Sequence, residues 1–198
     1  FMRRMGYPLP KFDFSVPGVS SISADLHKYG YAPKNASVVM YRSKELRRHQ
    51  IFACVSTTTY ALINPTILST KSGGPMAAAW AIMNYLGEEG YRNIVRDVTE
   101  ATRTMIARVN AIPGLRVLGD PEMCMFSFAA DSLNVFQIAD EMKKRDWYIQ
   151  PQFSTPLSPP NLHVTLTASS VANVELILRD LEGAVETVRA NYPMLDRV

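Results

Sequence analysis

Apolar and polar residues alternate in the second half of the chain with periods that separate helices from strands. In residues 91–111, apolar side chains recur at helical spacing with arginines between them, and Pro113-Gly114 follows. This pattern predicts a long amphipathic helix that ends before that pair. The further predicted elements are, in chain order, strands at 115–118 and 123–129, a helix at 134–145, a strand at 162–167 and a helix at 171–190. This order predicts a small sheet covered by helices.

Shorter elements are predicted in the first half. Two prolines and a glycine between Met5 and Pro10 exclude a regular helix there. The β-branched run at 37–41 predicts a strand, and Ser43 is a suitable N-cap for a short helix that follows it. The other expected elements are a short buried strand at 19–23, a segment at 51–70 that is more loop than element, and an alanine-rich helix at 76–86. That helix is apolar almost all round, which is typical of a buried helix.

The composition narrows the class of protein. Hydrophobic residues make up 47% of the 198-residue chain and charged residues 20%, values that are ordinary for a soluble folded protein. The net charge of +3 is spread without a polybasic block, which argues against a nucleic-acid or membrane-surface role. Cys54 and Cys124 lack metal-ligand spacing and predict two reduced thiols in a cytoplasmic protein. No apolar run approaches the length that spans a membrane, and no metal site is expected.

The main candidate for chemistry is the segment Ser23-Ala-Asp-Leu-His27-Lys28-Tyr-Gly30, in which a histidine precedes a lysine on a short connection. A lysine held in an apolar setting loses solvation of its charged form, so its pKa falls toward neutrality. Such an amine forms a Schiff base with a carbonyl, the way in which pyridoxal phosphate is held. From these residues by themselves, an exposed loop lysine beside a packed histidine is the simpler alternative.

A second candidate is the segment Ser69-Thr-Lys-Ser-Gly-Gly-Pro75, which precedes the alanine-rich helix. Its hydroxyls and backbone amides suit an anion at the helix N-terminus, and Lys71 adds positive charge. An ordinary cap and turn is the alternative that the residues leave open.

Three stretches together resemble a known family. They are Ser23-Ala-Asp-Leu-His27-Lys28-Tyr-Gly-Tyr-Ala-Pro-Lys34, Asn64-Pro-Thr-Ile-Leu-Ser-Thr70-Lys-Ser-Gly73 and Ala79-Trp80-Ala-Ile-Met-Asn-Tyr-Leu-Gly-Glu-Glu-Gly-Tyr91. The first resembles the Schiff-base segment of the group II pyridoxal-phosphate-dependent decarboxylases, and most of all their sphingosine-1-phosphate lyase branch. The resemblance is close over residues 1–90 and extends to the order of elements beyond them.

The resemblance implies an α/β fold, the PLP-dependent transferase-like fold type I. Residues 1–90 then correspond to the C-terminal part of the large cofactor-binding domain, and residues 91–198 to a linking helix and a small C-terminal domain. In such enzymes a long region before the lysine supplies the ring stacked on the cofactor and the aspartate paired with the pyridine nitrogen. We therefore expect the chain to be the C-terminal half of a longer subunit.

The resemblance also implies roles for single residues. Lys28 matches the lysine that binds pyridoxal 5'-phosphate and later moves protons, and His27 matches a histidine that donates a hydrogen bond to the cofactor phosphate. Lys34 matches a lysine that lines the active site in the lyase branch, with an exposed turn lysine as the alternative. Thr70 and Gly73 match a loop that reaches the partner's cofactor phosphate in a homodimer. Lys71 replaces the usual arginine of that loop, which keeps the charge but loses the bidentate fork.

Other candidates are weaker. Tyr60 stands two positions from the family's tyrosine, at whose position Leu62 is found, and we do not assign it a role. His49 and His163 are interpreted as surface and structural residues.

The function implied by the resemblance is a carbon–carbon lyase. It would split a phosphorylated long-chain amino alcohol into a fatty aldehyde and phosphoethanolamine by retro-aldol cleavage. The first alternative is an amino-acid decarboxylase of the glutamate or tyrosine type. The second, from another class, is a catalytically inert fragment that acts only as a folding or dimerisation module.

Overall fold

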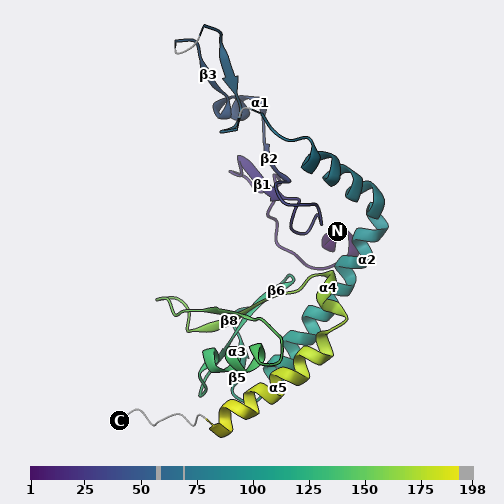
Figure 1. Ribbon diagram of the computed structural model, residues 1–198. Coiled ribbons are helices and arrows are strands. Elements are labelled where there is room, and N and C mark those ends of the chain that lie inside the picture. The colour runs from purple at the N-terminus through teal and green to yellow at the C-terminus, as the bar shows by residue number, and fades with distance from the viewer. Residues whose placement is uncertain (57–58, 69, 192–198) are drawn as a thin grey trace. The chain divides into compact units, whose positions relative to one another are not determined.

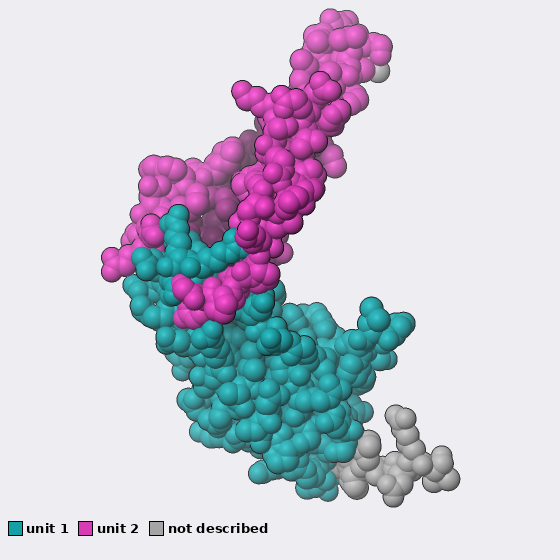
Figure 2. Space-filling view, turned by 180° about the vertical axis from the view of Figure 1, so that it is seen from behind, with its two compact units in different colours: residues 1–5, 92–198 teal, residues 6–91 magenta. Residues whose placement is uncertain are grey.

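The protein is described by a computed structural model that covers residues 1–56, 59–68 and 70–191. Its chain forms two compact units, coloured separately in Figure 2. One contains Gly6–Tyr91, and the other contains Phe1–Met5 together with the chain from Arg92 onward. Among the residues so described, none of the helices combines the length and apolar character needed to cross a lipid bilayer.

The Gly6–Tyr91 unit contains two antiparallel strand pairs. β1 (Ser21–Asp25) pairs with β2 (Ser37–Tyr41), and β3 (Phe52–Cys54) pairs with β4 (Leu62–Asn64) (Figure 1). The predicted strand at 37–41 is confirmed with the same bounds, whereas the strand predicted at 19–23 lies two residues later and is not buried. The loop expected over 51–70 contains the β3–β4 pair, whose strands are too short to show a sequence period.

Short helical turns connect these strands to their surroundings. α1 (Lys44–Arg47) begins after Ser43, whose hydroxyl accepts a hydrogen bond from the Leu46 backbone N–H at 3.3 Å, as the sequence predicts. The 3₁₀ turn η2 (Arg48–Gln50) follows directly. At the N-terminus, where a regular helix is excluded, the chain forms only the 3₁₀ turn η1 (Met2–Met5).

The helix α2 (Gly74–Ala111) contributes residues to both units. Its backbone is not helical at Gly87, where φ is 59° and ψ is −172°. Glycine adopts this left-handed φ without a steric penalty, whereas side chains with a Cβ do so only with strain. The two helices predicted at 76–86 and 91–111 are therefore confirmed, and a single glycine separates them.

The other unit is built on a sheet with the strand order β5-β6-β8-β7, in which neighbouring strands are antiparallel. Its elements are β5 (Leu115–Val117), β6 (Met125–Ala130), α3 (Val135–Lys143), β7 (Gln150–Gln152), β8 (Asn161–Thr165), α4 (Ala168–Val171) and α5 (Val174–Asn191). The predicted order of strands and helices is confirmed. β7 was not predicted, because Gln-Pro-Gln carries no apolar alternation.

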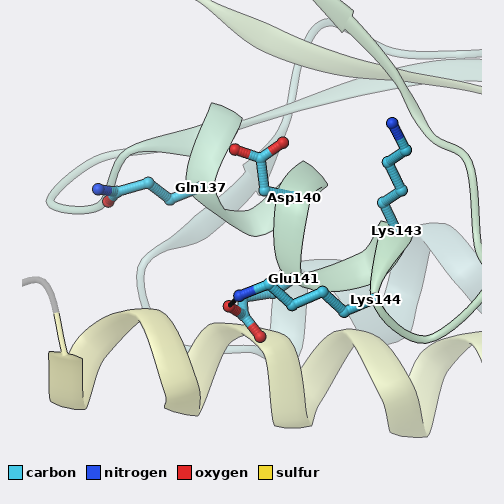
Figure 3. A pocket seen from close by; sticks show the side chains of 5 residues that line it. All are labelled: Gln137, Asp140, Glu141, Lys143 and Lys144. Atoms are coloured by element: carbon cyan, nitrogen blue, oxygen red, sulfur yellow. Dashed lines mark hydrogen bonds and ion pairs between the residues drawn. The ribbon is translucent and has the colours of Figure 1, made fainter.

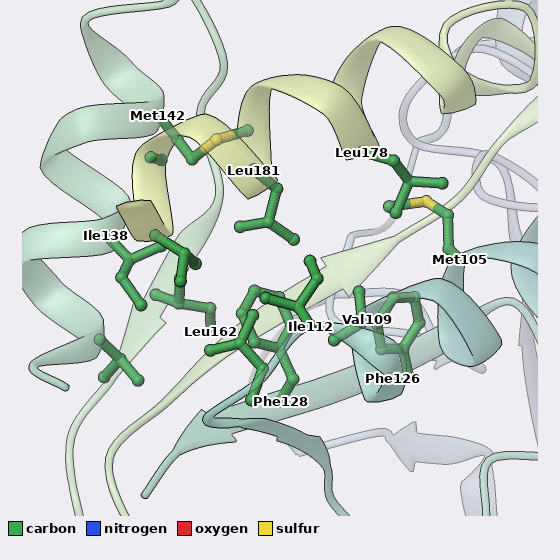
Figure 4. Packing of buried hydrophobic residues seen from close by; sticks show 14 of the residues in the cluster. Met105, Val109, Ile112, Phe126, Phe128, Ile138, Met142, Leu162, Leu178 and Leu181 are labelled. Atoms are coloured by element: carbon green, nitrogen blue, oxygen red, sulfur yellow. The ribbon is translucent and has the colours of Figure 1, made fainter. Parts of the chain in front are cut away.

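The core of this unit lies between the sheet and its helices (Figure 4). Phe128 on β6 and Leu162 on β8 are cross-strand partners, and both are fully buried. Helix α5 belongs to the same core. Its completely buried side chains, spaced about one turn apart, are Leu178, Leu181, Val185 and Val188. The helix predicted at 171–190 thus buries one apolar face in this core.

Candidate functional site

The predicted cofactor lysine lies in the short connection between β1 and β2. This connection folds on itself: the His27 N–H donates to the Ala36 carbonyl at 3.1 Å, and the Ala32 N–H donates to the Leu26 carbonyl at 3.0 Å. The Lys28 N–H donates to the Asp25 carbonyl at 3.1 Å. Three backbone hydrogen bonds therefore determine where the His27-Lys28 pair sits at the end of the hairpin.

The first half of α2 packs against this connection. Ala32 and Ala36 are buried against Ala79 of α2, with Leu26 and Ile82 packed around them. Alanine side chains allow the backbone of the loop to approach the helix closely, which explains why this part of α2 is rich in alanine. The predicted burial of this helix thus holds for one face, because Trp80 and Met83 are exposed.

The same connection is tied through Gly30 to Tyr91, which lies in α2 after the break at Gly87. The Tyr91 hydroxyl donates to the Gly30 carbonyl at 2.7 Å, and burial raises the pKa of Tyr91. A Cβ at position 30 would lie 2.5 Å from the Leu26 carbonyl oxygen. Only glycine allows this close approach, so Gly30 is required for the shape of the lysine loop.

The side chain of Lys28 does not lie in the apolar setting that the sequence analysis expects. It is 63% exposed, and its Nζ forms an ion pair with Asp25 Oδ2 at 2.8 Å. The apolar side chains of the loop pack toward α2, whereas the amine is paired with a carboxylate. In this chain the amine is thus accessible to solvent and held by an ion pair.

Asp25 is held by two hydrogen-bond donors. Its Oδ2 accepts from Lys28, and its Oδ1 accepts from the Ser37 hydroxyl at 2.6 Å. The hydrogen bond from Lys28, followed by that from Ser37, lowers the pKa of Asp25 from 3.8 to about 2. The carboxylate is therefore a fixed negative charge next to the predicted cofactor lysine.

His27 belongs to the same network. Its Nδ1 lies 3.2 Å from the Ala36 carbonyl oxygen and 3.4 Å from Ser37 Oγ. Because a carbonyl only accepts, the Nδ1 atom carries a proton in this arrangement. A second proton on Nε2 would make the ring a two-donor cation, which suits a phosphate group.

Two members of this group, Asp25 and Ser37, are not among the residues predicted from the sequence. They are 12 positions apart but directly opposite each other in the β1–β2 register. The signal available in the sequence was the three-residue spacing from Asp25 to Lys28, which a turn converts into a contact.

Of the remaining predicted site residues, Lys34 lies near Lys28 in the chain, and Thr70 and Gly73 lie in another segment of the unit. Lys34 is exposed in the turn before Ala36, in the same connection as Lys28. Thr70 and Gly73 are exposed ahead of α2, where the Gly73 carbonyl accepts from the Ala77 N–H at 2.9 Å. Within the part of the chain described, no hydrogen bond or ion pair joins Thr70 or Gly73 to His27 or Lys28. Ser69 of that predicted anion loop falls outside the described residues.

The candidates without an assigned role keep that status. Tyr60 is exposed, and Leu62 is half-buried in β4. His49 lies in η2, and His163 lies in β8, where its ring nitrogens are 3.4 Å from Ser127 Oγ and 3.1 Å from Thr165 Oγ1. Sheet hydroxyls therefore satisfy His163, in agreement with a structural role.

A hollow of about 550 Å³ is lined by residues of α3 and by Lys144, whose side chains Figure 3 draws. Glu141, one of the charged residues that line it, forms local ion pairs with Lys144 at 2.5 Å and with Arg145 at 3.0 Å. These two cations lower the pKa of Glu141. A second hollow of about 700 Å³ adjoins the β3–β4 pair and is lined in part by Phe52, Leu62 and Ile67.

The groups around Lys28 fit pyridoxal phosphate. An accessible primary amine and an imidazole next to it in sequence, on a loop whose shape requires glycine, are groups of the kind that this cofactor would need as a covalent anchor and a phosphate donor. His27 and Lys28 are the residues of the described chain that would hold the cofactor.

The lowered pKa of Asp25 leads to a pH prediction. Its contacts stabilise the folded hairpin above the ordinary pKa of 3.8, and this contribution is lost as the pH falls through about 2. A carbon-detected NMR titration of the Asp25 carboxyl is expected to show a midpoint near 2 in the wild type. Lys28→Ala is expected to move the midpoint further toward 3.8 than Ser37→Ala, because Lys28 is the larger cause. Equal midpoints in all three proteins would contradict the network.

Comparisons with known proteins relate this chain to one group. No family model matches it. It is 40% identical to sphingosine-1-phosphate lyase of Oryza sativa subsp. japonica and 42% identical to that of Arabidopsis thaliana, in each case over 96% of this chain. These alignments cover 35% and 34% of the two relatives, so the chain spans about a third of the length of the curated relatives it matches.

Solved structures agree with this relationship. The sphingosine-1-phosphate lyase of Burkholderia pseudomallei superposes with a TM-score of 0.88 at 38% identity, over 96% of this chain and 42% of that one. A Lactobacillus brevis glutamate decarboxylase superposes with a TM-score of 0.77 at 17% identity, over 92% of this chain and 43% of that one, which is a likeness of fold. The chain is therefore a homologue of the sphingosine-1-phosphate lyases and has the corresponding part of the fold type I architecture of the pyridoxal-phosphate enzymes.

Proposed function

We propose that this protein binds pyridoxal 5'-phosphate through Lys28 and acts as a carbon–carbon lyase on a phosphorylated long-chain amino alcohol. The observation that supports this most is the accessible Lys28 amine next to His27, on a loop that α2 and Gly30 hold in one shape. Homology over 96% of the chain to relatives named as sphingosine-1-phosphate lyases supports the same reading.

In this proposal each residue of the loop has a limited task. Lys28 anchors the cofactor and, once released, exchanges a proton at the substrate carbon through its Nζ. His27 donates from its ring to the cofactor phosphate, and Lys34, exposed in the same connection, attracts the substrate phosphate. When bound, the cofactor supplies an electron sink for the bond cleavage.

A decarboxylase of the same fold is the second candidate. One relative, from Methanothermobacter thermautotrophicus, is named a probable L-tyrosine/L-aspartate decarboxylase and is 32% identical over 92% of this chain. The higher identities to the named lyases favour the lyase. Product analysis separates the two, because the lyase releases a long-chain aldehyde and the decarboxylase releases carbon dioxide.

We also propose that two copies pair and share the site. Support comes from large apolar side chains that are exposed in the Gly6–Tyr91 unit on β3, β4 and the start of α2, among them Phe52, Ile63, Met76 and Trp80. Large apolar side chains exposed in such number on one unit are typical of an interaction site. In a two-fold pair, Thr70 and Gly73 of each copy would serve the phosphate of the other. We place the reaction in the cytoplasm, where thiols such as Cys54 and Cys124 stay reduced.

The test is reductive trapping. The protein, isolated at the length at which its cells make it, is incubated with pyridoxal phosphate and borohydride, and its peptides are mapped by mass spectrometry. The cofactor adduct is expected on Lys28 and is expected to disappear in Lys28→Arg, while Lys34→Arg retains it. An adduct confined to other lysines, or none in a folded sample, would contradict the proposal and favour an inert dimerisation module.

A further inference from the structure

We propose that Asp25 is a positioning residue for Lys28: its carboxylate, fixed by Ser37, holds the free Lys28 amine in the hydrogen-bond network to which His27 also belongs. This inference deepens the proposed function and rests on the assignment of Lys28 as the cofactor lysine. It concerns the free amine of Lys28.

Asp25 is itself held in place by the neighbouring strand. It is the last residue of β1, and its backbone is paired with Ser37 at the start of β2. The Ser37 hydroxyl donates to Asp25 Oδ1 at 2.6 Å, a short hydrogen bond to a charged acceptor. The carboxylate plane is thus determined from the neighbouring strand, independently of Lys28.

The other carboxylate oxygen of Asp25 remains for the lysine. The Lys28 N–H donates to the Asp25 carbonyl, which closes a turn, and the three-residue spacing places the two side chains together. Oδ2 then accepts from Nζ at 2.8 Å. One carboxylate oxygen anchors Asp25 to the strand, and the other anchors the amine.

Ser37 connects both predicted cofactor residues. Its Oγ lies 3.4 Å from His27 Nδ1, so the serine contacts the imidazole as well as the carboxylate that holds Lys28. His27, Lys28 and Ser37 are the charged or polar side chains with a described contact or electrostatic effect on Asp25. The long and otherwise mobile side chain of Lys28 is the group that this arrangement orders.

The contribution of this pair is position rather than stability. The side chains are 63% and 36% exposed, and ion pairs exposed to solvent contribute little to folding free energy. Because His27 belongs to the same network through Ser37, a phosphorylated aldehyde bound to the imidazole would meet an amine whose position is fixed. The pairing also means that the amine must leave Asp25 before its lone pair can react.

The experiment is competitive labelling of the cofactor-free protein with trace acetic anhydride at neutral pH. The readout is the ratio of acetylation at Lys28 to that at Lys34, because Lys34 lies in the same connection and reports any general loosening of the loop. In Asp25→Asn the ratio is expected to rise about two- to fivefold, the range of one exposed ion pair. Ser37→Ala, which leaves the charge but removes its anchor, is expected to give a smaller rise.

Glu45→Gln is the matched control, since it removes a carboxylate from α1 in the same unit without a described contact to Lys28. An unchanged ratio in Asp25→Asn overturns the inference. If that variant fails to fold, an unchanged ratio in Ser37→Ala overturns it.

The two proposals fail in different ways. Labelling uses no cofactor, so a raised ratio with no borohydride adduct on Lys28 would retain the role of Asp25 as the partner of the amine and refute the enzyme. An adduct on Lys28 with an unchanged ratio would retain the enzyme and refute the role of Asp25.

Discussion

Replacing Phe128 with alanine is expected to destabilise the sheet-containing unit by about 3–5 kcal/mol, the usual cost of truncating a buried aromatic residue. Phe128 is 1% exposed on β6, and its ring centroid lies 6.5 Å from that of Phe126. The ring packs in the same core as its cross-strand partner Leu162 and the buried face of α5 (Figure 4). Removing the ring is therefore expected to leave a cavity in that core. The measurement is urea unfolding followed by far-ultraviolet circular dichroism.

The control for this prediction is Met125→Ala on the same strand. Met125 is 47% exposed, so its truncation is expected to cost less than about 1 kcal/mol. Equal shifts of the urea midpoint for the two variants would show that Phe128 does not belong to the core.

Replacing Trp80 with glutamate is expected to weaken self-association about 100-fold, which corresponds to about 2.7 kcal/mol. Met76, Trp80 and Met83 follow one another at three- and four-residue spacing along α2 and form an exposed apolar stripe. Trp80 is its largest member and is 67% exposed in the single chain. A charge placed in the centre of an apolar interface loses hydration without gaining a partner.

Sedimentation velocity over a range of concentrations measures this effect. Tyr85→Glu is the matched control, because Tyr85 lies on the same helix segment, is 85% exposed and falls outside the stripe. It is expected to associate like the wild type. If Trp80→Glu and Tyr85→Glu behave alike, the stripe does not form the interface between copies.

The elements that could be predicted from the sequence are those with a long period or a strong local signal. The helix at 91–111, the helix at 171–190 and the cap at Ser43 were all recognisable in this way. β3, β4 and β7 have three residues each, which is too short for an alternation to stand out from chance. Because their pairing depends on neighbouring strands, no local sequence pattern predicts it.

The candidate site likewise has features that the local sequence predicts and features that depend on tertiary packing. The adjacency of His27 and Lys28 is written into the chain, and the resemblance of that segment to a known family led directly to the cofactor prediction. The side chain of Lys28 is exposed in this chain and paired with Asp25, and its expected apolar surroundings stay a prediction, because burial depends on which segments pack over a side chain. The roles of Thr70, Gly73 and Lys34 stay predictions that the structure does not test.

By itself the sequence determined the order of the longer helices and strands and the His27-Lys28 pair. Only the tertiary structure decided that Ser37 meets Asp25 across 12 positions and that Tyr91 holds Gly30 across 61. The physical reason is that covalent spacing sets helical and turn contacts, whereas contacts between distant residues arise from strand register and packing. The charged partner of Lys28 is anchored by one of these distant contacts.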